Sequence, residues 1–375
     1  MDIESLSNEE KSRYSRHITL REIGAEGQLK LKNSRVLVVG AGGLGCPVLS
    51  YLTAAGIGKI GIVDYDVIEL SNLQRQTLYS VDDIGKSKAE TAAKKLKSLN
   101  PNVELSVYNY ALTTENAPDI ITAYDVVIDG CDNIPTRYLL NDACILYNKP
   151  LIYGSIYQFE GQVSLFNYEA GPNYRDLFPT PPPQHLVPGC AEGGVMGVLP
   201  GIIGSMQAVE AIKLITGAGE LLAGRQLLYD ALSHRTRILN IRKQIDNKTI
   251  QKLINYDEFC GTIKSDSMSP AVKEITVSEL KKMIDDKVPF QLIDVREPNE
   301  FEFANIGGEL IPLGKLTDHT DEISKDKPVL MFCRSGRRSE DAVLTLQQRG
   351  FDNCYNVVGG ILAWSDEIDS SIPKY

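Results

Sequence analysis

The chain has 375 residues, of which 43% are hydrophobic and 23% charged, and a formal net charge of −10. This length allows two domains with a sizeable core each, and the acidic balance argues against nucleic acid or an anionic membrane surface as a partner. No apolar run reaches about 18 residues and the first residues are polar, so we expect neither a membrane span nor a signal peptide. The seven cysteines, an odd number in a long chain, indicate reduced thiols and a cytoplasmic location. We expect most of them to be buried as small hydrophobic side chains.

Residues 35–64 predict a nucleotide-binding βαβ unit, preceded by a helical pattern over residues 1–33. A short apolar run leads into a glycine turn, and a helical pattern begins at Cys46; the glycines are Gly40, Gly42, Gly43 and Gly45. Glycines let backbone N–H groups approach a phosphate, and the helix dipole favours its negative charge. Asp64 ends the next apolar run, where a carboxylate can hold a ribose hydroxyl. Alone, this pattern indicates a dinucleotide such as NAD.

The polar residues after Asp64 favour a triphosphate instead. A loop and the start of the next amphipathic helix supply phosphate-seeking donors, namely Asn72, Gln74, Arg75 and Lys88. Arginine offers a bidentate fork and lysine a point charge, and a dehydrogenase needs two cations here less than a triphosphate does. The alternative is that they are solvated surface charges. The same choice holds for Arg16, which belongs either to a solvated basic turn or to the nucleotide site.

Asp132 follows the next predicted strand, residues 125–129, and Pro135 then opens a helix. The aspartate would lie at the carboxyl end of a parallel strand, where open α/β sheets bind their ligands. A carboxylate beside a nucleotide can bind magnesium together with phosphate oxygens. The alternative is that Asp132 caps the helix.

The rest of the first predicted domain contains a second candidate residue, Cys190. Residues 151–168 predict two strands around Gly161, residues 169–197 a long irregular stretch, and residues 199–216 a helix, with strands to Ile241 closing the domain. A long irregular stretch in a compact domain is usually functional or disordered. Cys190 lies inside it between glycines, and is either a reactive thiol on a loop or a structural cysteine.

Residues 246–272 are rich in Lys, Asp, Asn and Ser and predict a linker, and a second domain begins at Lys273. In that domain a predicted strand ends at Cys333, and a loop with three arginines leads into a helix. Backbone donors and the helix dipole stabilise a thiolate in such a place. The pocket can hold a nucleophilic thiolate, a phosphocysteine or a persulfide. Phosphotyrosine phosphatases have an arginine six positions after the cysteine, but this chain has Ser339 there, which favours the persulfide.

Taken together, these motifs resemble a known combination of families. Residues 10–245 resemble the adenylyltransferases that activate ubiquitin-like sulfur carriers in the molybdopterin and thiamine pathways, relatives of ubiquitin-activating enzymes. Residues 273–375 are similar to a rhodanese domain. The resemblance implies an α/β fold: a Rossmann-like, ubiquitin-activating-type domain in residues 1–245, a linker in residues 246–272, and a small α/β rhodanese domain in residues 273–375.

The resemblance also implies roles for residues of this sequence. Cys333 would carry a persulfide, and Cys190 would take the carrier as a thioester or acyl disulfide. Arg75 would act on the phosphates, together with Arg16 from the other subunit of a homodimer, and Asp132 would work with Mg²⁺. ATP would be held by Gly40, Gly42, Gly43, Asp64, Asp66, Ser71, Asn72, Leu73, Gln74, Arg75, Lys88, Asp132 and Asn133.

One departure from the family concerns zinc. The family usually holds a structural zinc through two Cys-x-x-Cys pairs. In this chain the place of the first pair runs from Asn173 to Asp176, and the second retains only Cys260. Four thiolates cannot be assembled from these residues, so we expect no zinc.

We therefore expect an enzyme that adenylylates the C-terminal glycine of a ubiquitin-like sulfur-carrier protein and then transfers persulfide sulfur to give a thiocarboxylate. The pathway favoured by the resemblance is molybdenum cofactor biosynthesis, and the persulfide donor would be a cysteine desulfurase or thiosulfate. The alternatives are the same chemistry on a thiamine-pathway or other carrier, an NAD-dependent oxidoreductase, and a docking scaffold for a ubiquitin-like protein without ATP turnover.

Overall fold

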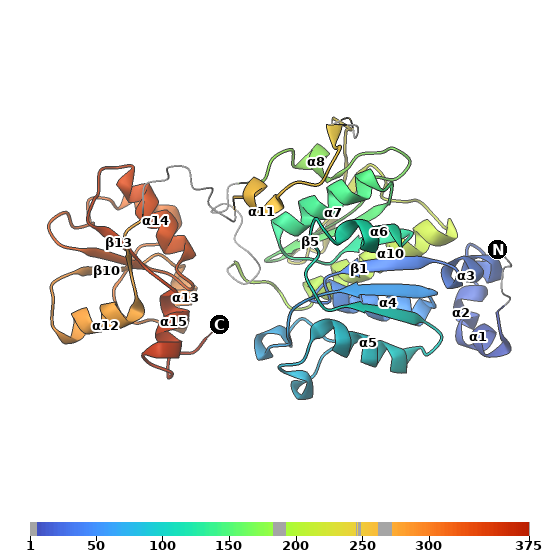
Figure 1. Cartoon of the computed structure of the whole chain (residues 1–375), viewed down its shortest axis with the longest axis horizontal. Helices are drawn as coiled ribbons and strands as arrows, with labels where there is room; N and C mark the ends of the chain where they lie inside the picture. Colours follow the sequence, from blue (N-terminus) through green and yellow to red (C-terminus); the bar gives the residue numbers. More distant parts are fainter. Residues whose placement is uncertain (1–5, 183–192, 245, 247–248, 262–271, 375) are drawn as a thin grey trace. The chain divides into compact units, whose positions relative to one another are not determined.

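The computed structural model describes residues 6–182, 193–244, 246, 249–261 and 272–374. The chain divides into two compact units, Met1–Ser265 and Asp266–Tyr375 (Figure 1). Among the described residues, no helix combines the length and apolarity that crossing a bilayer requires.

The first unit is built on an eight-stranded sheet with the order β3-β2-β1-β4-β5-β6-β7-β8. The strands from β3 to β5 pair in parallel, and those from β5 to β8 pair antiparallel. Their bounds are β1 Arg35–Val39, β2 Lys59–Val63, β3 Glu104–Tyr108, β4 Val126–Asp129, β5 Leu151–Tyr157, β6 Glu160–Phe166, β7 Arg225–Asp230 and β8 Arg235–Asn240. The central strand β1 is buried along most of its length, as expected for a parallel strand covered on both faces.

Helices cover both faces of this sheet (Figure 1). Alternate residues of β1 point to opposite faces: Val36 and Val38 join one apolar cluster, and Leu37 and Val39 join the other. The first cluster is completed by α3 Gly24–Lys32, α4 Gly45–Ala55, α5 Lys88–Leu99 and α10 Leu199–Thr216. The second is completed by α6 Ala117–Thr122, α7 Ile134–Leu146, α8 Tyr174–Leu177 and α11 Tyr256–Phe259.

The turn between β1 and α4 depends on glycine at two positions. Gly40 has a φ of +98°, and a Cβ there would lie 2.5 Å from the carbonyl oxygen of Gly130. A Cβ on Gly45 would lie 1.9 Å from the carbonyl oxygen of Gly40. Only glycine allows this approach, so the turn of β1 comes directly against the turn that follows β4.

Three expected elements differ in the structure. Residues 8–32 form three short helices, α1 Asn8–Arg13, α2 Ser15–Ile18 and α3, rather than one helical stretch. The turn between β5 and β6 lies at Gln158 and Phe159, and Gly161 is inside β6. Glycine is needed there because a Cβ would collide with Ile203 of α10. The expected irregular stretch contains α8, and Cys190 lies outside the described residues.

The second unit is a five-stranded parallel sheet with the order β11-β10-β12-β13-β9. Its strands are β9 Glu274–Ile275, β10 Gln291–Asp294, β11 Glu309–Leu310, β12 Val329–Phe332 and β13 Cys354–Val357. One apolar cluster packs against α14 and the other against α12 and α15. The helices are α12 Val277–Asp285, α13 Pro298–Phe303, α14 Arg337–Gln347 and α15 Gly360–Glu367.

Part of the expected linker is folded onto the first unit. Tyr256 and Cys260 are buried in the cluster around α7, and Leu253, Ile254 and Phe259 pack against it. Asn255 caps α11 by accepting a hydrogen bond from the N–H of Glu258. The segment from residue 253 to residue 260 therefore contributes to the core of the first unit.

A buried arginine ties α11 to α7 and α8. Arg175 forms a two-pronged ion pair with Asp142, with Nε–Oδ1 and Nη2–Oδ2 distances of 2.8 and 2.7 Å. Its guanidinium lies 4.8 Å from the ring centroids of both Tyr138 and Phe259. The hydroxyl of Tyr256 donates to Oδ2 of Asp142 at 2.8 Å. Because Asp142 is buried and the side chain of Arg175 is only 12% exposed, removing one charge leaves the other unpaired in a largely desolvated environment.

We predict that Arg175→Met lowers the free energy of unfolding of the first unit by about 3 kcal/mol or more, measured by urea unfolding with circular dichroism. The matched control is Arg35→Met, which breaks a two-pronged pair with Asp125 that is about half exposed, and should change stability by about 1 kcal/mol or less. Equal effects of the two substitutions would contradict a buried tie at Arg175.

Candidate active site

The first candidate site lies at the carboxyl ends of three neighbouring parallel strands. Strands β2, β1 and β4 are adjacent in the sheet and end at Val63, Val39 and Asp129. The N–H of Gly40 donates to the carbonyl oxygen of Val63, and the N–H of Gly130 donates to that of Val39, each at 2.8 Å. The segments that follow the three strands are therefore held side by side, at the edge where open α/β sheets bind their ligands.

Asp64 is fixed to the glycine turn. Its Oδ2 accepts the N–H of Ala41 at 2.7 Å and its Oδ1 accepts the N–H of Asp66 at 2.9 Å. Burial raises the pKa of Asp64, while these two hydrogen bonds and the charge of Lys88 oppose the rise. The carboxylate is therefore held at the end of β2 by a direct hydrogen bond to the turn that we expect to hold phosphates.

Lys88 is buried at the start of α5 and points toward the same edge. Its Nζ pairs with Oδ2 of Asp66 at 2.8 Å. The hydroxyl of Tyr79 donates to the carbonyl oxygen of Ala41 at 2.8 Å and lies 3.1 Å from that of Lys88. Tyr79 thus connects the glycine turn to the helix start. Sequence reasoning missed this residue because its role depends on two backbone carbonyls that are distant in the chain.

The loop from Ser71 to Gln76 packs over the glycine turn. The Cγ of Arg75 would lie 3.8 Å from a Cβ on Gly43, and the amide of Gln76 lies beside Gly42. Nη1 of Arg75 donates to the carbonyl oxygen of Ser71 at 3.0 Å. Asn72 is buried, Leu73 is half-buried and Gln74 is exposed. The structure therefore brings Arg75 to the turn, as the phosphate assignment requires.

Asp132 is exposed and does not cap α7. The cap is Asn133, whose side chain accepts the N–H of Thr136 at 2.9 Å, so the capping alternative for Asp132 is wrong. Among described residues no hydrogen bond to Asp132 is found. Its charge, with those of Asp66 and Asp64, adds to burial in raising the pKa of Tyr65. Asp132 therefore lies within electrostatic range of Tyr65, as Asp64 and Asp66 do.

Arg16 is not brought to this edge within one chain. It is exposed on α2, and Tyr14, two residues earlier, contacts Gly56 at the carboxyl end of α4. The glycine turn lies at the amino end of the same helix. Arg16 is therefore separated from the other candidate residues by the length of α4, and contributes to this site only if it comes from a second copy.

Cys333 follows β12 in the second unit and is 0% exposed. The N–H of Gly336 donates to its Sγ at 3.1 Å, and Oγ of Ser339 lies 3.5 Å from the sulfur. The Ser339 hydroxyl is also 2.7 Å from Oδ1 of Asn356 on β13. Gly336 has a φ of +95° and caps α14. The loop therefore curls around the sulfur and aims a backbone donor at it, which stabilises negative charge there.

The arginines of this loop do not all serve the sulfur. Arg338 forms a two-pronged pair with Glu300 of α13, with distances of 2.7 and 2.6 Å. Burial raises the pKa of Glu300, but the hydrogen bonds from Arg338 and from the backbone of Glu297 outweigh it and lower this pKa below its ordinary value. Arg338 is therefore engaged in holding α13 to the start of α14.

The other described cysteines are buried structural residues. Burial raises the pKa of the Cys46 thiol to about 12, and those of Cys260 and Cys354 to about 11. It also raises the pKa values of Cys131 and Cys144. These thiols stay protonated and enclosed at neutral pH, as expected from their sequence context.

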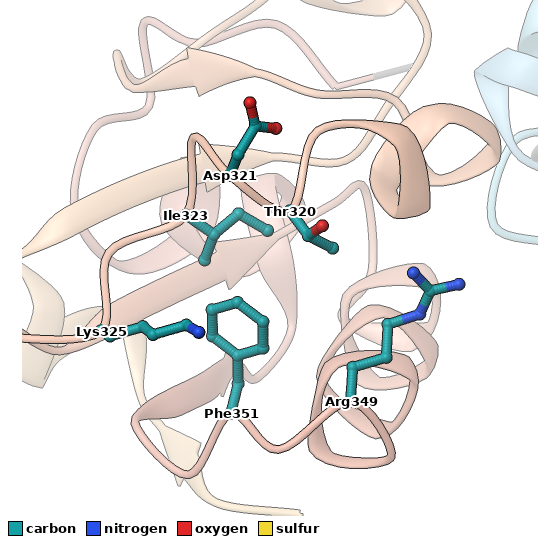
Figure 2. A pocket seen from close by; sticks show the side chains of 6 residues that line it. All are labelled: Thr320, Asp321, Ile323, Lys325, Arg349 and Phe351. Atoms are coloured by element: carbon teal, nitrogen blue, oxygen red, sulfur yellow. The ribbon is translucent and has the colours of Figure 1, made fainter.

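A shallow pocket of about 490 Å³ in the second unit contains none of the candidate residues (Figure 2). Its lining comes from the segments that lead into β12 and β13, at the amino ends of these strands, whereas Cys333 follows the carboxyl end of β12. The Nζ of Lys325 lies 5.3 Å from the ring centroid of Phe351. The lining residues are Thr320, Asp321, Ile323, Lys325, Arg349 and Phe351.

The geometry defines a two-part enzyme class: a Rossmann-like nucleotide-binding unit followed by a small α/β unit with a cysteine cradled at a strand end. The chain belongs to the ThiF family, whose model matches residues 14–250, and a rhodanese-like domain matches residues 276–367. These matches confirm the expected fold class and the resemblance drawn from the motifs.

Relatives with both parts are similar along almost the whole chain. The "Probable adenylyltransferase/sulfurtransferase MoeZ" of Mycobacterium tuberculosis (strain ATCC 25618 / H37Rv) is 44% identical over 99% of this chain and 97% of its own. The "Adenylyltransferase and sulfurtransferase MOCS3" of Aedes aegypti is 43% identical over 100% of this chain and 91% of its own. The protein is accordingly an enzyme with adenylyltransferase and sulfurtransferase parts. The NAD-dependent oxidoreductase alternative finds no support.

A solved structure shows the same fold for the first part. The crystal structure of E. coli MccB with ATP has a TM-score of 0.54 and 24% identity, and covers 64% of this chain and 73% of its own. Among the solved structures, PaaA is likewise similar, with a TM-score of 0.55.

The residues at the family's zinc position do not fit a tetrahedral metal site. No group of three or more His, Cys, Asp or Glu residues is placed to hold a metal within the described part of the chain. Oδ2 of Asp176 accepts the N–H of Asn173 at 2.8 Å. Arg175 belongs to the first segment, and its guanidinium lies 4.8 Å from the ring centroid of Phe259 in the second. Its positive charge opposes the rise that burial causes in the pKa of Cys260. A cation in this place disfavours binding of a second cation. Asp142 of α7 joins the segments instead, because it pairs with Arg175 and accepts a hydrogen bond from Tyr256.

We predict that the purified protein contains less than about 0.1 zinc per chain by elemental analysis. Its melting temperature should not change after dialysis against a chelator, because the Arg175 contacts need no metal. One zinc per chain, or a fall in melting temperature on chelation, would show that a ligand set exists that these residues do not provide.

Proposed function

We propose that the protein activates the C-terminal glycine of a ubiquitin-like sulfur-carrier protein with ATP and converts it to a thiocarboxylate. The observation that carries the proposal is the gathering of Arg75, Asp64 and the Lys88–Asp66 pair around one glycine turn, together with a cysteine cradled by a backbone donor in the same chain. The two-part relatives named adenylyltransferase and sulfurtransferase support this order of steps.

In the first step, an oxygen of the carrier's carboxylate attacks the α-phosphate of ATP. The bond from the α-phosphate to the bridging oxygen breaks, pyrophosphate leaves, and an acyl-adenylate forms. The N–H groups of the turn and the cations of Arg75 and Lys88 offset negative charge that develops on the phosphates. Mg²⁺ at Asp132 would supply further charge neutralisation. The step is needed because a carboxylate is a poor acyl donor, whereas AMP is a good leaving group.

In the second step, the terminal sulfur of a persulfide on Cys333 attacks the acyl carbon and releases AMP, which leaves an acyl disulfide. A second thiol then attacks Sγ of Cys333 and releases the thiocarboxylate, forming a disulfide that a cellular dithiol must reduce. We assign the second thiol to Cys190 on its sequence context. The N–H of Gly336, which donates to Sγ of Cys333, supports the Cys333 thiolate that takes up the donor's sulfur before the persulfide forms.

The finer assignments belong to the same proposal. The exposed position of Arg16, away from the turn of its own chain, supports a homodimer in which each copy completes the site of the other. A second domain that begins at residue 273, a cytoplasmic location, and a carrier of the molybdenum cofactor pathway rather than the thiamine pathway rest on the sequence alone. Incubating the protein with ATP and each candidate carrier, then weighing the carrier for a thiocarboxylate, tests which carrier is used and whether the chain is only a docking scaffold.

We predict that Arg75→Ala and Lys88→Ala each lower carrier-dependent ATP–pyrophosphate exchange by about 100-fold or more, a typical loss for a group that stabilises transition-state charge. The matched control is Lys94→Ala, an exposed lysine on the same helix as Lys88, which should exchange at the wild-type rate. Wild-type exchange in both site variants would refute the ATP assignment.

We predict that Cys333→Ala leaves pyrophosphate exchange within about twofold of wild type and abolishes sulfur transfer from thiosulfate, because adenylation uses no thiol. Fluorescence of Trp364, buried in the second unit, checks that the variant is folded. If a folded Cys333→Ala variant lost pyrophosphate exchange, the two steps would not be separable as proposed.

A further inference from the structure

The pocket of the second unit has a base of apolar side chains (Figure 2). Ile323 and Phe351 form this base and are only 4% and 6% exposed. Both belong to the apolar cluster that packs against α14, so the base is part of the folded core. The pocket volume of about 490 Å³ falls within the range of small-molecule sites, about 300 to 1,000 Å³. A small organic molecule therefore fits here.

Two cationic side chains border the apolar base. Figure 2 shows Lys325 and Arg349 on opposite sides of the Phe351 ring. Lys325 comes from the segment that leads into β12, and Arg349 from the segment that leads into β13. The Nζ of Lys325 lies 5.3 Å from the ring centroid of Phe351, within the range of a cation–π contact. Nη1 of Arg349 donates to the carbonyl oxygen of Thr317 at 3.3 Å.

Neither of these charges is neutralised by a carboxylate. Within the described residues, Lys325 and Arg349 form no ion pair, and Nε and Nη2 of Arg349 donate no hydrogen bond. The lining contains one carboxylate, Asp321, and Figure 2 shows it directed away from the Phe351 ring. The lining thus has a positive balance in a chain whose net charge is −10. An arginine fork and a lysine point charge together favour an anion.

The pocket is separate from the sulfur site. It lies at the amino ends of β12 and β13, whereas Cys333 follows the carboxyl end of β12. The four residues of β12, Val329–Phe332, span about 13 Å at the rise of a parallel strand. A small molecule bound in the pocket therefore does not reach the sulfur of Cys333.

We propose that this pocket binds a small organic carboxylate. The carboxylate group lies between Lys325 and Arg349, and the apolar part of the ligand lies against Ile323 and Phe351. An inorganic anion would leave the apolar base uncovered, and a neutral ligand would leave both cations unpaired. The inference goes beyond the proposed function, because neither adenylation nor sulfur transfer uses this pocket.

An NMR titration of the full-length protein, labelled at isoleucine methyl groups, tests the site with phenylacetate. The methyl resonance of Ile323 should shift saturably with a Kd of about 1 mM or lower, a reasonable affinity for so small a ligand. Ile361, whose N–H donates to the carbonyl oxygen of Cys333 at 2.9 Å, reports on the sulfur site and should not shift. Phenylacetamide has the same shape without the charge and should bind about fivefold more weakly or less.

Two substitutions test the role of the cations. Lys325→Met and Arg349→Met keep an unbranched apolar side chain and remove the charge, and each should raise the Kd of phenylacetate by about three- to fivefold, as expected for a partly solvated ion pair. The matched control is Lys327→Met, an exposed lysine two residues further on that does not line the pocket. It should leave the Kd unchanged. Melting temperatures establish that each variant is folded.

The results that would overturn the inference are distinct. The first is the absence of a saturable Ile323 shift in the wild-type protein. The second is equal binding of phenylacetate and phenylacetamide, or an unchanged Kd in both folded variants, because the cations would then not hold the ligand. A shift at Ile361 without one at Ile323 would place the acid at the sulfur site instead. None of these outcomes affects the proposed function, which pyrophosphate exchange and sulfur transfer test independently.

Discussion

The close approach of two backbone turns is the constraint on which the first unit depends. The turn after β1 and the turn after β4 touch through Gly40 and Gly130, where any side chain would collide with a carbonyl group. This contact places Asp64, the glycine turn and the segment that contains Asp132 at one edge of the sheet.

The second unit also presents its candidate residue at the end of a parallel strand. A parallel strand again delivers a functional residue to its carboxyl end, but the group is a thiol and the loop after it supplies a backbone donor to the sulfur. The buried pair of Arg296 with Asp294 and the partly buried pair of Arg338 with Glu300 fix the segments around that loop. The sulfur is therefore served by a backbone donor, whereas Arg338 holds α13 to the start of α14.

The ion pair of Arg175 with Asp142 lies where the family resemblance implies a zinc site. Two segments that relatives are expected to join through zinc are joined here by an arginine that meets one carboxylate and two aromatic rings. The geometry also explains why residues 253–260, polar enough to look like a linker, belong to a core: Tyr256 and Phe259 bring apolar area that alternates with exposed charges.

The sequence by itself determined the two-part α/β organisation, the glycine turn, and the identity of Asp64, Arg75, Lys88 and Cys333 as candidates. These follow from local patterns, because a strand, a glycine turn and a helix start are encoded by neighbouring residues. Only the tertiary structure decided that Asn133 rather than Asp132 caps α7, that Arg338 pairs with Glu300, and that the amide oxygen of Gln76 is buried and finds no hydrogen-bond donor among the described residues. Such facts depend on which distant side chains meet. Local patterns cannot report those meetings, since hydrogen-bond satisfaction and burial are properties of the packed chain.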